Sequence, residues 1–400
     1  MSETRMRHPG LVIYSPFYYP KLISTGKSNT LLGKKLYRQS WDIDVVCSHP
    51  LYPHWQPIPT NGQLPGTRFF RGGGLLHYPA SAMLRRALLE LWFTFHAVRT
   101  TIKIKNEIDV AVSIYLPSLF AIFMHAILPE RVRKVGIIHD LQGVYSQQGY
   151  SSGSSLLTKI IHAVEERCFK SSDRLIFFSQ DIARVAIESL GIQKSKSFVQ
   201  YPFITLDPGL PLTDALESIL PWGTRHVVYS GALGEKQEPE LMSELMAKAA
   251  VAFPEARFHI FSGGPKFDAL REQYERKGLL HFHALIPEEQ LAELYARSSV
   301  QVVPQAPGTE HGSLPSKLPN LLAAGVQILA ICSDASEVSV LLKKTEMATL
   351  VPDWTEDSFL AGMTEALHAT ATITHETRRA SSAHLFPLFQ VSQLAHLVID

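Results

Sequence analysis

Cysteine is scarce in this chain, whose 400 residues include only Cys47, Cys168 and Cys332. The three lie far apart in the sequence, and an odd number cannot pair completely. Neither a disulfide framework nor the closely spaced pairs of a zinc site are visible. The sequence therefore indicates a reducing compartment, of which the cytoplasm is the simplest.

An excess of one charge is also missing, because 38 Lys and Arg residues face 37 Asp and Glu residues. Dedicated nucleic-acid binders usually carry a strong positive balance, so the composition predicts no nucleic-acid partner. Hydrophobic residues make up 46% of the chain. At this length, that content is enough for two ordinary α/β domains, each with its own core.

Long apolar runs are missing too. The polar segment Met1–Gly10 leads only into Leu11–Tyr14, which is too short for the core of a signal peptide. The most apolar window, Ile108–Leu128, contains Asp109 and Pro117 and divides into a strand-like half and a helix-like half. We therefore expect a buried strand followed by a helix there, rather than a membrane span.

Short strand-like runs alternate with helical segments along the chain. In order, the runs are Leu11–Tyr14, Asp44–Cys47, Val110–Ile114, Lys134–Ile138, Arg174–Phe178, Val227–Ser230, Arg257–Phe261, Val300–Val303 and Gln327–Ile331. Strands that alternate with helices form parallel sheets. Two such series predict an α/β protein with two Rossmann-like, doubly wound domains facing each other across a cleft.

The segment Tyr201–Asp214 separates the two series, because proline and glycine interrupt the periodic pattern there. We expect an N-terminal domain over residues 1–205 and a C-terminal domain over residues 206–385. The final segment, 386–400, is expected to form a helix that crosses back to the N-terminal domain. In open α/β sheets the ligand lies beyond the carboxyl ends of the strands, so the loops after the strands are the candidate sites.

The first candidate loop contains Gly26 and Lys27, within Ser24–Asn29. The glycine would let the backbone approach a donor ligand, and a helix starting there would direct N–H groups towards it. Gly-Lys-Ser is not a P-loop, since Lys21 stands where that motif requires its first glycine. The alternative is an ordinary turn.

His139 and Asp140 follow the strand-like run Lys134–Ile138. Such a pair at the end of a strand suits sugar recognition or electrostatic support of a reacting centre, which makes both residues catalytic candidates. The alternative is a helix-capping Asp140 beside a packed His139.

Glycine-rich loops follow two strands of the second half. Ser230 and Gly231 lead to Lys236, and a lysine behind such a turn could hold a diphosphate. Gly263 and Gly264 could supply further backbone donors near the same rim.

The most informative loop runs from Gln305 to Leu318 and opens a helix. The backbone N–H groups of Gly312, Ser313 and Leu314 could turn towards a diphosphate at the start of that helix. Lys317 and Asn320 are three residues apart, so we expect them to share one helix face towards the donor.

Taken together, these stretches resemble family 4 of the retaining glycosyltransferases, and most closely the branch of colanic-acid and O-antigen transferases of bacterial surface polysaccharide pathways. The likeness spans roughly residues 11 to 342. The stretches that carry it are Tyr14-Ser15-Pro16 with Thr25-Gly26-Lys27, Leu51-Tyr52-Pro53-His54-Trp55-Gln56, Tyr229-Ser230-Gly231 with Glu235-Lys236-Gln237, and Leu314-Pro315-Ser316-Lys317-Leu318 with Asn320.

The resemblance implies a GT-B fold whose N-terminal domain holds the acceptor and whose C-terminal domain holds a nucleotide sugar. It implies a retaining transfer from a UDP or GDP sugar to a glycan or polyprenyl-linked acceptor. It also implies no required metal and no cofactor other than the nucleotide sugar itself. In the family, the lysine at the position of Lys236 binds the donor diphosphate, and a histidine placed like His139 lies near the reacting sugar.

This chain departs from the family pattern at three positions. Ala232 stands where an arginine is usual, and Gly312 and Asn320 stand where two glutamates are usual. Glu310 lies two residues before the first of these positions and could compensate, which makes it a catalytic candidate. Asn320 could still bond a ribose as a neutral partner.

The segment Ser81–Lys105 predicts a helix with an apolar stripe and five basic residues. Such a helix could lie on an anionic membrane surface, which would place the protein peripherally at the inner face of the plasma membrane. The alternative is a domain helix whose stripe packs on the sheet. A polyprenyl-linked acceptor would favour the interpretation as a membrane-surface helix.

Two further functions stay open from the sequence. One is a GT-B sugar epimerase or phosphorylase. The other is a catalytically weakened relative that acts as a scaffold in a polysaccharide complex.

Overall fold

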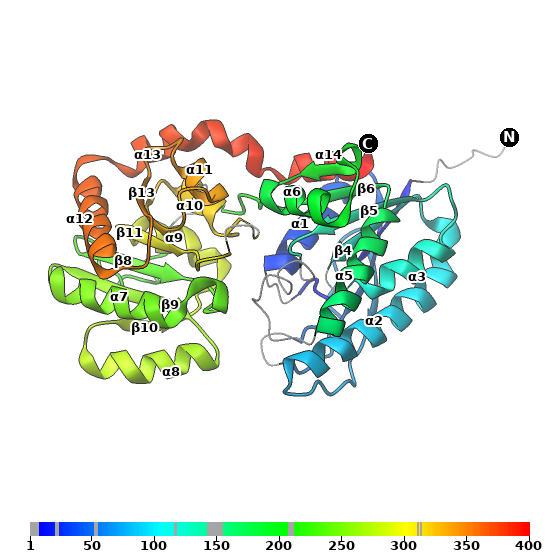
Figure 1. Ribbon diagram of the computed structural model, residues 1–400, viewed down its shortest axis with the longest axis horizontal. Helices are drawn as coiled ribbons and strands as arrows, with labels where there is room; N and C mark the ends of the chain where they lie inside the picture. Colours follow the sequence, from blue (N-terminus) through cyan, green and yellow to red (C-terminus); the bar gives the residue numbers. More distant parts are fainter. Residues whose placement is uncertain are drawn as a thin grey trace. The chain divides into compact units, whose positions relative to one another are not determined.

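The computed structural model describes residues 8–20, 24–51, 55–115, 118–141, 155–206, 212–309, 312 and 314–400. These residues form two compact units (Figure 1). Unit 1 comprises the described residues up to Tyr201 together with Gln390–Asp400, and unit 2 comprises Pro202–Phe389. The boundary thus lies slightly before the one expected between residues 205 and 206.

Unit 1 contains a parallel sheet of seven strands within the described ranges, in the order β3-β2-β1-β4-β5-β6-β7. Every neighbouring pair is parallel. The strands are β1 (Gly10–Tyr14), β2 (Asp42–Ser48), β3 (Thr67–Gly72), β4 (Val110–Tyr115), β5 (Arg133–Ile138), β6 (Arg174–Phe177) and β7 (Ser197–Val199).

Helices cover both faces of this sheet. They are α1 (Ser24–Tyr37), α2 (Ala82–Ile104), α3 (Leu119–Ile127), α5 (Ser155–Lys170), α6 (Gln180–Leu190) and α14 (Val391–Ile399). Successive residues of a strand point to opposite faces. Tyr14 accordingly meets α2, where its hydroxyl is 2.6 Å from that of Thr101, while Ile13 lies against Gly33 of α1.

The last helix, α14, packs with α1 (Figure 1). Arg133 donates to the carbonyl of Ile399 at 2.6 Å, and Arg174 donates to that of Leu397 at 2.6 Å. Cations near the C-terminal end of a helix also complement its dipole. Two arginines of the sheet therefore fix the end of the chain to unit 1.

Unit 2 contains six parallel strands among its described residues, in the order β10-β9-β8-β11-β12-β13. They are β8 (Arg225–Ser230), β9 (Ala256–Ser262), β10 (His281–Ala284), β11 (Val300–Pro304), β12 (Gln327–Ile331) and β13 (Ala348–Val351). The helices are α7 (Pro239–Ala252), α8 (Pro265–Tyr274), α9 (Leu291–Arg297), α10 (Leu318–Ala324), α11 (Glu337–Leu342), α12 (Glu356–Thr372) and α13 (His375–Ser382).

Local sequence signals set several helix ends. The hydroxyls of Ser336, Thr355 and Thr374 accept from backbone N–H groups in the first turns of α11, α12 and α13. At the other end of α10, Gly325 has φ +71°, the left-handed conformation that terminates many helices. A Cβ at Gly325 would also collide with the carbonyl of His375, so the close packing of α13 on α10 requires glycine there.

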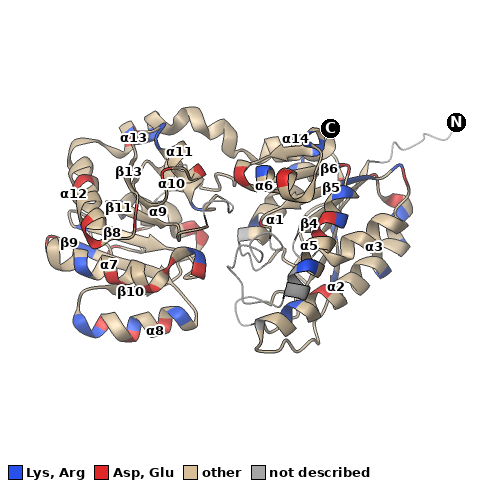
Figure 2. Cartoon of the chain, viewed as in Figure 1, with Lys and Arg blue, Asp and Glu red and all other residues tan. Residues whose placement is uncertain are grey.

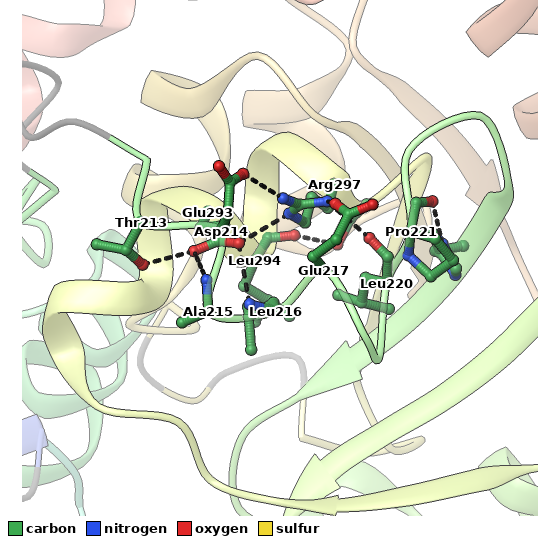
Figure 3. Close-up of polar contacts among 12 residues, drawn as sticks. Thr213, Asp214, Ala215, Leu216, Glu217, Leu220, Pro221, Glu293, Leu294 and Arg297 are labelled. Atoms are coloured by element: carbon green, nitrogen blue, oxygen red, sulfur yellow. Dashed lines mark hydrogen bonds and ion pairs between the residues drawn. The ribbon is translucent and has the colours of Figure 1, made fainter.

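Near the start of unit 2 the chain is held by an ion network around a buried arginine (Figure 3). The Arg297 side chain of α9 is fully buried and contacts the carboxylates of Asp214, Glu217 and Glu293. Glu293 in turn accepts from the backbone N–H of Leu216 at 3.0 Å. These bonds hold the segment 213–220 on α9.

All nine strands expected from the sequence are present, and Ile108–Leu128 forms β4 followed by α3. The expectation missed β3, β7, β10 and β13. These four are the outermost strands of the two sheets. Among the helices that the structure describes, none combines the length and apolarity needed to cross a membrane.

Candidate functional site

The strand order of unit 2 defines one point where a ligand is expected. From β8 the chain proceeds through β9 to β10 on one side, and from β11 through β12 to β13 on the other. The two directions diverge between β8 and β11, which are hydrogen-bonded neighbours. In doubly wound sheets, ligands bind beyond the carboxyl ends of the strands at such a switch point.

Lys317 occupies this switch point. Its ammonium donates to the carbonyl of Val302 in β11 at 2.9 Å and to that of Ser230 in β8 at 3.3 Å. The same nitrogen lies 4.2 Å from the centre of the Tyr229 ring. Burial lowers the pKa of Lys317 to about 7, because the charged form loses its hydration there. An anion bound here would therefore favour the charged form of Lys317.

Lys236 belongs to the same edge of the sheet. It is exposed on a short 3₁₀ turn (Glu235–Gln237) that follows the loop after β8. Its carbonyl accepts from the N–H of Ala306 at 3.0 Å, so this turn is joined to the loop after β11. The structure thus brings both predicted lysines to neighbouring loops of unit 2.

The backbone N–H groups of two glycines in these loops bond within the fold. The N–H of Gly231 is donated to the carbonyl of Phe261 at 3.0 Å, and the N–H of Gly312 to that of Thr309 at 3.0 Å. Buried backbone groups must find partners, and these two find them inside the fold. Gly231 is glycine because its φ is +146°, not because its N–H turns outwards.

Ser230 and Leu314 are also part of the protein interior. The Ser230 hydroxyl donates to the side chain of Gln301 at 3.3 Å, and its carbonyl accepts from Lys317. Leu314 is buried with 3% of its surface exposed. Both residues therefore stabilise the carboxyl edge of the sheet and do not present a side-chain group to a ligand.

Gly263 and Gly264 lie between β9 and α8, where a Cβ on either residue would meet open space. Gly264 has φ +98°, which excludes most other residues. The ten-residue helix α8 begins immediately afterwards, so its unsatisfied N–H groups are directed towards this edge.

Asn320 has a different role from the one expected. Its carboxamide oxygen accepts from the backbone N–H groups of Thr205 at 2.7 Å and Leu206 at 3.0 Å. Lys317 precedes α10, and its side chain turns back to the strands instead. The two residues therefore bind different segments and do not present one face to a donor.

Two polar atoms at this edge were missed by sequence reasoning. The hydroxyl of Ser262, at the end of β9, and the amide oxygen of Gln305, after β11, are buried and have no hydrogen-bond partner within the described part of the chain. Their only sequence signal was their position directly at the ends of strands. Glu310 and Ser313 lie outside the described residues, and their roles stay predictions.

His139 directly follows β5 in unit 1. Its ring stacks on that of Phe178 with centroids 4.3 Å apart and an interplanar angle of 16°. Its Nε2 atom is buried and finds no hydrogen-bond partner among the described residues. Burial lowers the pKa of His139 to about 4, so the imidazole is neutral at pH 7. A neutral ring offers one donor and one acceptor.

Asp140 follows His139, and its carboxylate accepts from the N–H of Leu141 at 3.1 Å. Gly26 lies in the first turn of α1, where a Cβ would stand 3.5 Å from the backbone of Phe17 and Tyr18. The close approach made by Gly26 is thus to its own chain. Roles for Gly26, its neighbour Lys27 and Asp140 towards a ligand stay predictions.

Comparison with known proteins connects this geometry to a family. A family model described as Glycosyltransferase Family 4 matches residues 25–208, and one described as Glycosyl transferases group 1 matches residues 217–382. A sequence search of curated proteins found no match.

Several solved structures share the fold. Sucrose-phosphate synthase from Thermosynechococcus elongatus is 16% identical, with a TM-score of 0.75 and 97% of each chain covered. WaaG, a glycosyltransferase involved in lipopolysaccharide biosynthesis, is 12% identical, with a TM-score of 0.70 over 97% of this chain and 99% of that one. HepE from Anabaena, in complex with UDP, is 13% identical, with a TM-score of 0.64 and 97% of each chain covered.

The two matched models follow one another along the chain as its two units do, and the strand orders are those of two Rossmann-like domains. The chain is therefore a glycosyltransferase of the GT-B fold and belongs to the family 4 type.

Proposed function

We propose that the protein transfers a hexose from a UDP or GDP sugar to a glycan or polyprenyl-linked acceptor in bacterial exopolysaccharide or lipopolysaccharide biosynthesis. Unit 2 would bind the donor and unit 1 the acceptor. The observation that carries the donor assignment is the ammonium of Lys317 at the switch point between β8 and β11. The complex of HepE with UDP and the role of WaaG in lipopolysaccharide biosynthesis support the classes of donor and pathway.

In the proposed reaction, the bond between the anomeric carbon and the diphosphate oxygen breaks. The acceptor hydroxyl forms its bond on the same face, so the configuration is retained. The hydroxyl proton passes to the leaving diphosphate, and the products are a nucleoside diphosphate and a lengthened acceptor. Negative charge grows on the diphosphate as the bond breaks, and interactions that strengthen with that charge accelerate the reaction.

Lys236 and Lys317 would supply these interactions. Lys236 is exposed and can approach the diphosphate as a point charge. Lys317 is held by two carbonyls, so its position is fixed before the donor arrives. The start of α8 behind Gly264 would add a favourable helix dipole.

His139 would bond a hydroxyl of the transferred sugar through its Nε2 atom. A buried imidazole whose pKa is lowered to about 4 is a poor proton donor at pH 7. Its contribution is therefore orientation, with the ring held against Phe178. The lysines take the role that a metal has in other transferases, so we propose a reaction that proceeds in the presence of a chelator.

A polyprenyl-linked acceptor would be embedded in a membrane. With such an acceptor, we propose that the protein acts in the cytoplasm as a peripheral protein at the inner face of the plasma membrane.

Isothermal titration with UDP and with GDP tests the donor site. We expect one of them to bind the wild-type protein and Lys236→Ala to weaken that binding by about tenfold, since a hydrogen bond to a charged group contributes about 1.5–3 kcal/mol. Lys248→Ala is the matched control, because Lys248 forms ion pairs with Glu244 and Glu356 on the surface. Equal nucleotide affinity of both variants would show that Lys236 is not part of the donor site.

Incubation with the matching nucleotide sugar then separates the alternatives. Transfer to an acceptor, with the anomeric configuration followed by NMR, supports the proposal. Turnover of the donor without an acceptor would indicate an epimerase, and phosphate-dependent turnover a phosphorylase. Nucleotide binding without any turnover would favour the scaffold.

A further inference from the structure

Helix α2 of unit 1 carries two apolar stripes. The inner stripe consists of Leu89, Phe93, Ala97 and Ile104, all of which are buried in the core. This stripe accounts for the attachment of α2 to the sheet. The inner stripe alone therefore provides the packing that is expected of a domain helix. The remaining apolar residues of α2 are not needed for it.

The outer stripe consists of Leu84, Leu91, Phe95 and Ile102, which are 60%, 64%, 68% and 56% exposed. Their spacings of seven, four and seven residues place them on one line along the helix. Met83, the residue before Leu84, is also exposed, at 58%, but it lies about 100° around the helix from this line. Single exposed hydrophobic residues are normal, but a row of them along a helix marks an interaction surface.

Helix α2 contains four Lys or Arg residues and one acidic residue (Figure 2). Arg99 and Lys103 are exposed and follow Phe95 and Ile102 along the helix. The only acidic residue of α2 is Glu90, whose carboxylate accepts from the N–H groups of Ser118 and Leu119 at the start of α3. The acid is thus used inside the unit, and the outer face of α2 is apolar and basic.

This combination favours one partner over others. Two copies of the chain that met through the same face would place the basic residues of α2 against an equally basic face, without an acid from that face to offset them. An anionic lipid surface offers negative charge at the headgroups and an apolar layer behind them. The inner stripe is fixed in the core, so α2 would lie on a bilayer rather than cross it.

We propose that the outer face of α2 docks unit 1 onto a bilayer containing anionic lipids. Leu84, Leu91, Phe95 and Ile102 enter the boundary between headgroups and acyl chains, and Arg99 and Lys103 contact the anionic headgroups.

The start of α2 also borders the loops after β2 and β3. Arg85 lies over the ring of Trp55 at 4.3 Å, and Trp92 donates to the hydroxyl of Tyr78 at 2.6 Å. The docking surface is therefore continuous with the carboxyl edge of the unit 1 sheet. Where the proposed transferase function holds, this continuity selects a lipid-linked sugar as the acceptor.

Flotation with lipid vesicles tests the docking surface. We expect the wild-type protein to float with vesicles of phosphatidylcholine and phosphatidylglycerol, and not with phosphatidylcholine alone. A double change of Leu91→Glu and Phe95→Glu should reduce the bound fraction at least tenfold. Arg99→Glu with Lys103→Glu should also reduce the bound fraction. Vesicle binding by the wild-type protein should weaken as the salt concentration rises, and the residual binding of this double variant should not. Val251→Glu is the matched control, because Val251 is a single residue of α7 that is 67% exposed.

Nucleotide binding by each variant, measured by titration, shows whether unit 2 is intact, and it is independent of vesicle binding. Failure of the wild-type protein to float with anionic vesicles would overturn the docking proposal and leave the transferase proposal standing. A dimer in light scattering that Phe95→Glu dissociates, without vesicle binding, would likewise overturn it in favour of a second copy.

Discussion

The carboxamide of Asn320 holds Thr205 through both of its polar atoms. The oxygen accepts from the Thr205 N–H at 2.7 Å, and the nitrogen is 3.0 Å from the Thr205 hydroxyl. The oxygen also accepts from the N–H of Leu206. A residue three positions after Lys317 thus fastens the segment that opens unit 2 to helix α10.

Asn320→Ala should therefore reduce stability more than nucleotide binding. The change leaves two backbone N–H groups without their acceptor, which costs about 1–3 kcal/mol for a buried donor. Chemical denaturation of the variant should show the loss, while the Kd for the nucleotide stays within about twofold. Asn320→Asp keeps the acceptor oxygen and should recover part of the stability. Unchanged stability with a clear loss of nucleotide affinity would instead place Asn320 at the ribose.

Binding of the donor should draw a proton to Lys317. Burial lowers the pKa of the free side chain to about 7, and a bound diphosphate favours the charged form. As the pH rises above 7, an increasing fraction of the protein must take up a proton on binding. Nucleotide affinity should then fall by up to about tenfold per pH unit, the limit for one linked proton.

Titration at pH 8 in buffers with different ionisation enthalpies measures this proton uptake directly. Lys317→Arg should remove it, because a guanidinium stays protonated throughout this range. Proton uptake that persists in Lys317→Arg would mean that another group carries the linkage.

The strands that sequence reasoning found and missed follow one physical rule. Interior strands of a parallel sheet are covered on both faces and read as continuous apolar runs. Val300–Pro304, for example, is buried at every residue. The edge strand His281–Ala284 has only one buried residue, Phe282, and contains two histidines. Its strand conformation depends on pairing with β9, which the local sequence does not encode.

The candidate site likewise combines features that the sequence predicts with features that depend on distant contacts. The positions of Lys236 and Lys317 followed from their place behind strands, which the fold class determines. The partner of Asn320 is 115 residues away in the chain, so local spacing could not reveal it. The N–H of Gly312 was expected to turn towards a diphosphate, and its bond to Thr309 depends on how the loop folds back, which local spacing does not encode.

His139→Ala should lower turnover with little change in nucleotide affinity. The imidazole is neutral at pH 7, since burial lowers its pKa to about 4, and a neutral hydrogen bond contributes about 0.5–1.5 kcal/mol. The expected loss in kcat is about two- to tenfold. His139→Gln, which retains a donor, should recover part of it. An inflection near pH 6.5 in the pH–rate profile that vanishes in His139→Ala would contradict the neutral assignment.

Arg297→Met should destabilise unit 2 strongly. The guanidinium is fully buried and contacts three carboxylates, of which Glu293 is itself buried (Figure 3). Removing one partner from a buried ion network costs about 3–5 kcal/mol, because the remaining charge has no compensation. Arg276→Met, at an arginine that is 81% exposed, should change stability by less than about 0.5 kcal/mol. Thermal unfolding compares the two variants, and similar midpoints would show that the network is dispensable.

A chain of three imidazoles should make unit 2 sensitive to acid. His226 contacts the carbonyl of Pro221 at 3.1 Å, its other nitrogen is 3.0 Å from His259, and His259 is 3.0 Å from His283. A carbonyl only accepts, so His226 Nε2 carries the proton and its Nδ1 accepts from His259. His259 then accepts from His283 in the same way. This order of bonds requires His226 and His259 to be neutral, because a second proton on either ring would face the N–H of the next imidazole.

Burial, followed by neighbouring imidazoles and Arg257, lowers the pKa of His259, and burial with His281 lowers that of His283 to about 4. In the unfolded chain these groups titrate near pH 6.5, so their contribution to stability is complete above that pH. Below it the unfolded state binds more protons than the folded state, and stability falls by up to about 1.4 kcal/mol per pH unit for each ring.

Amide hydrogen exchange of β8, β9 and β10 should therefore accelerate between pH 6.5 and pH 4, after correction for the intrinsic rate. His283→Asn should flatten this dependence, whereas His396→Asn, at a histidine that is 76% exposed, should leave it unchanged. Equal dependence in the wild type and His283→Asn would mean that the imidazole chain does not set the acid limit of unit 2.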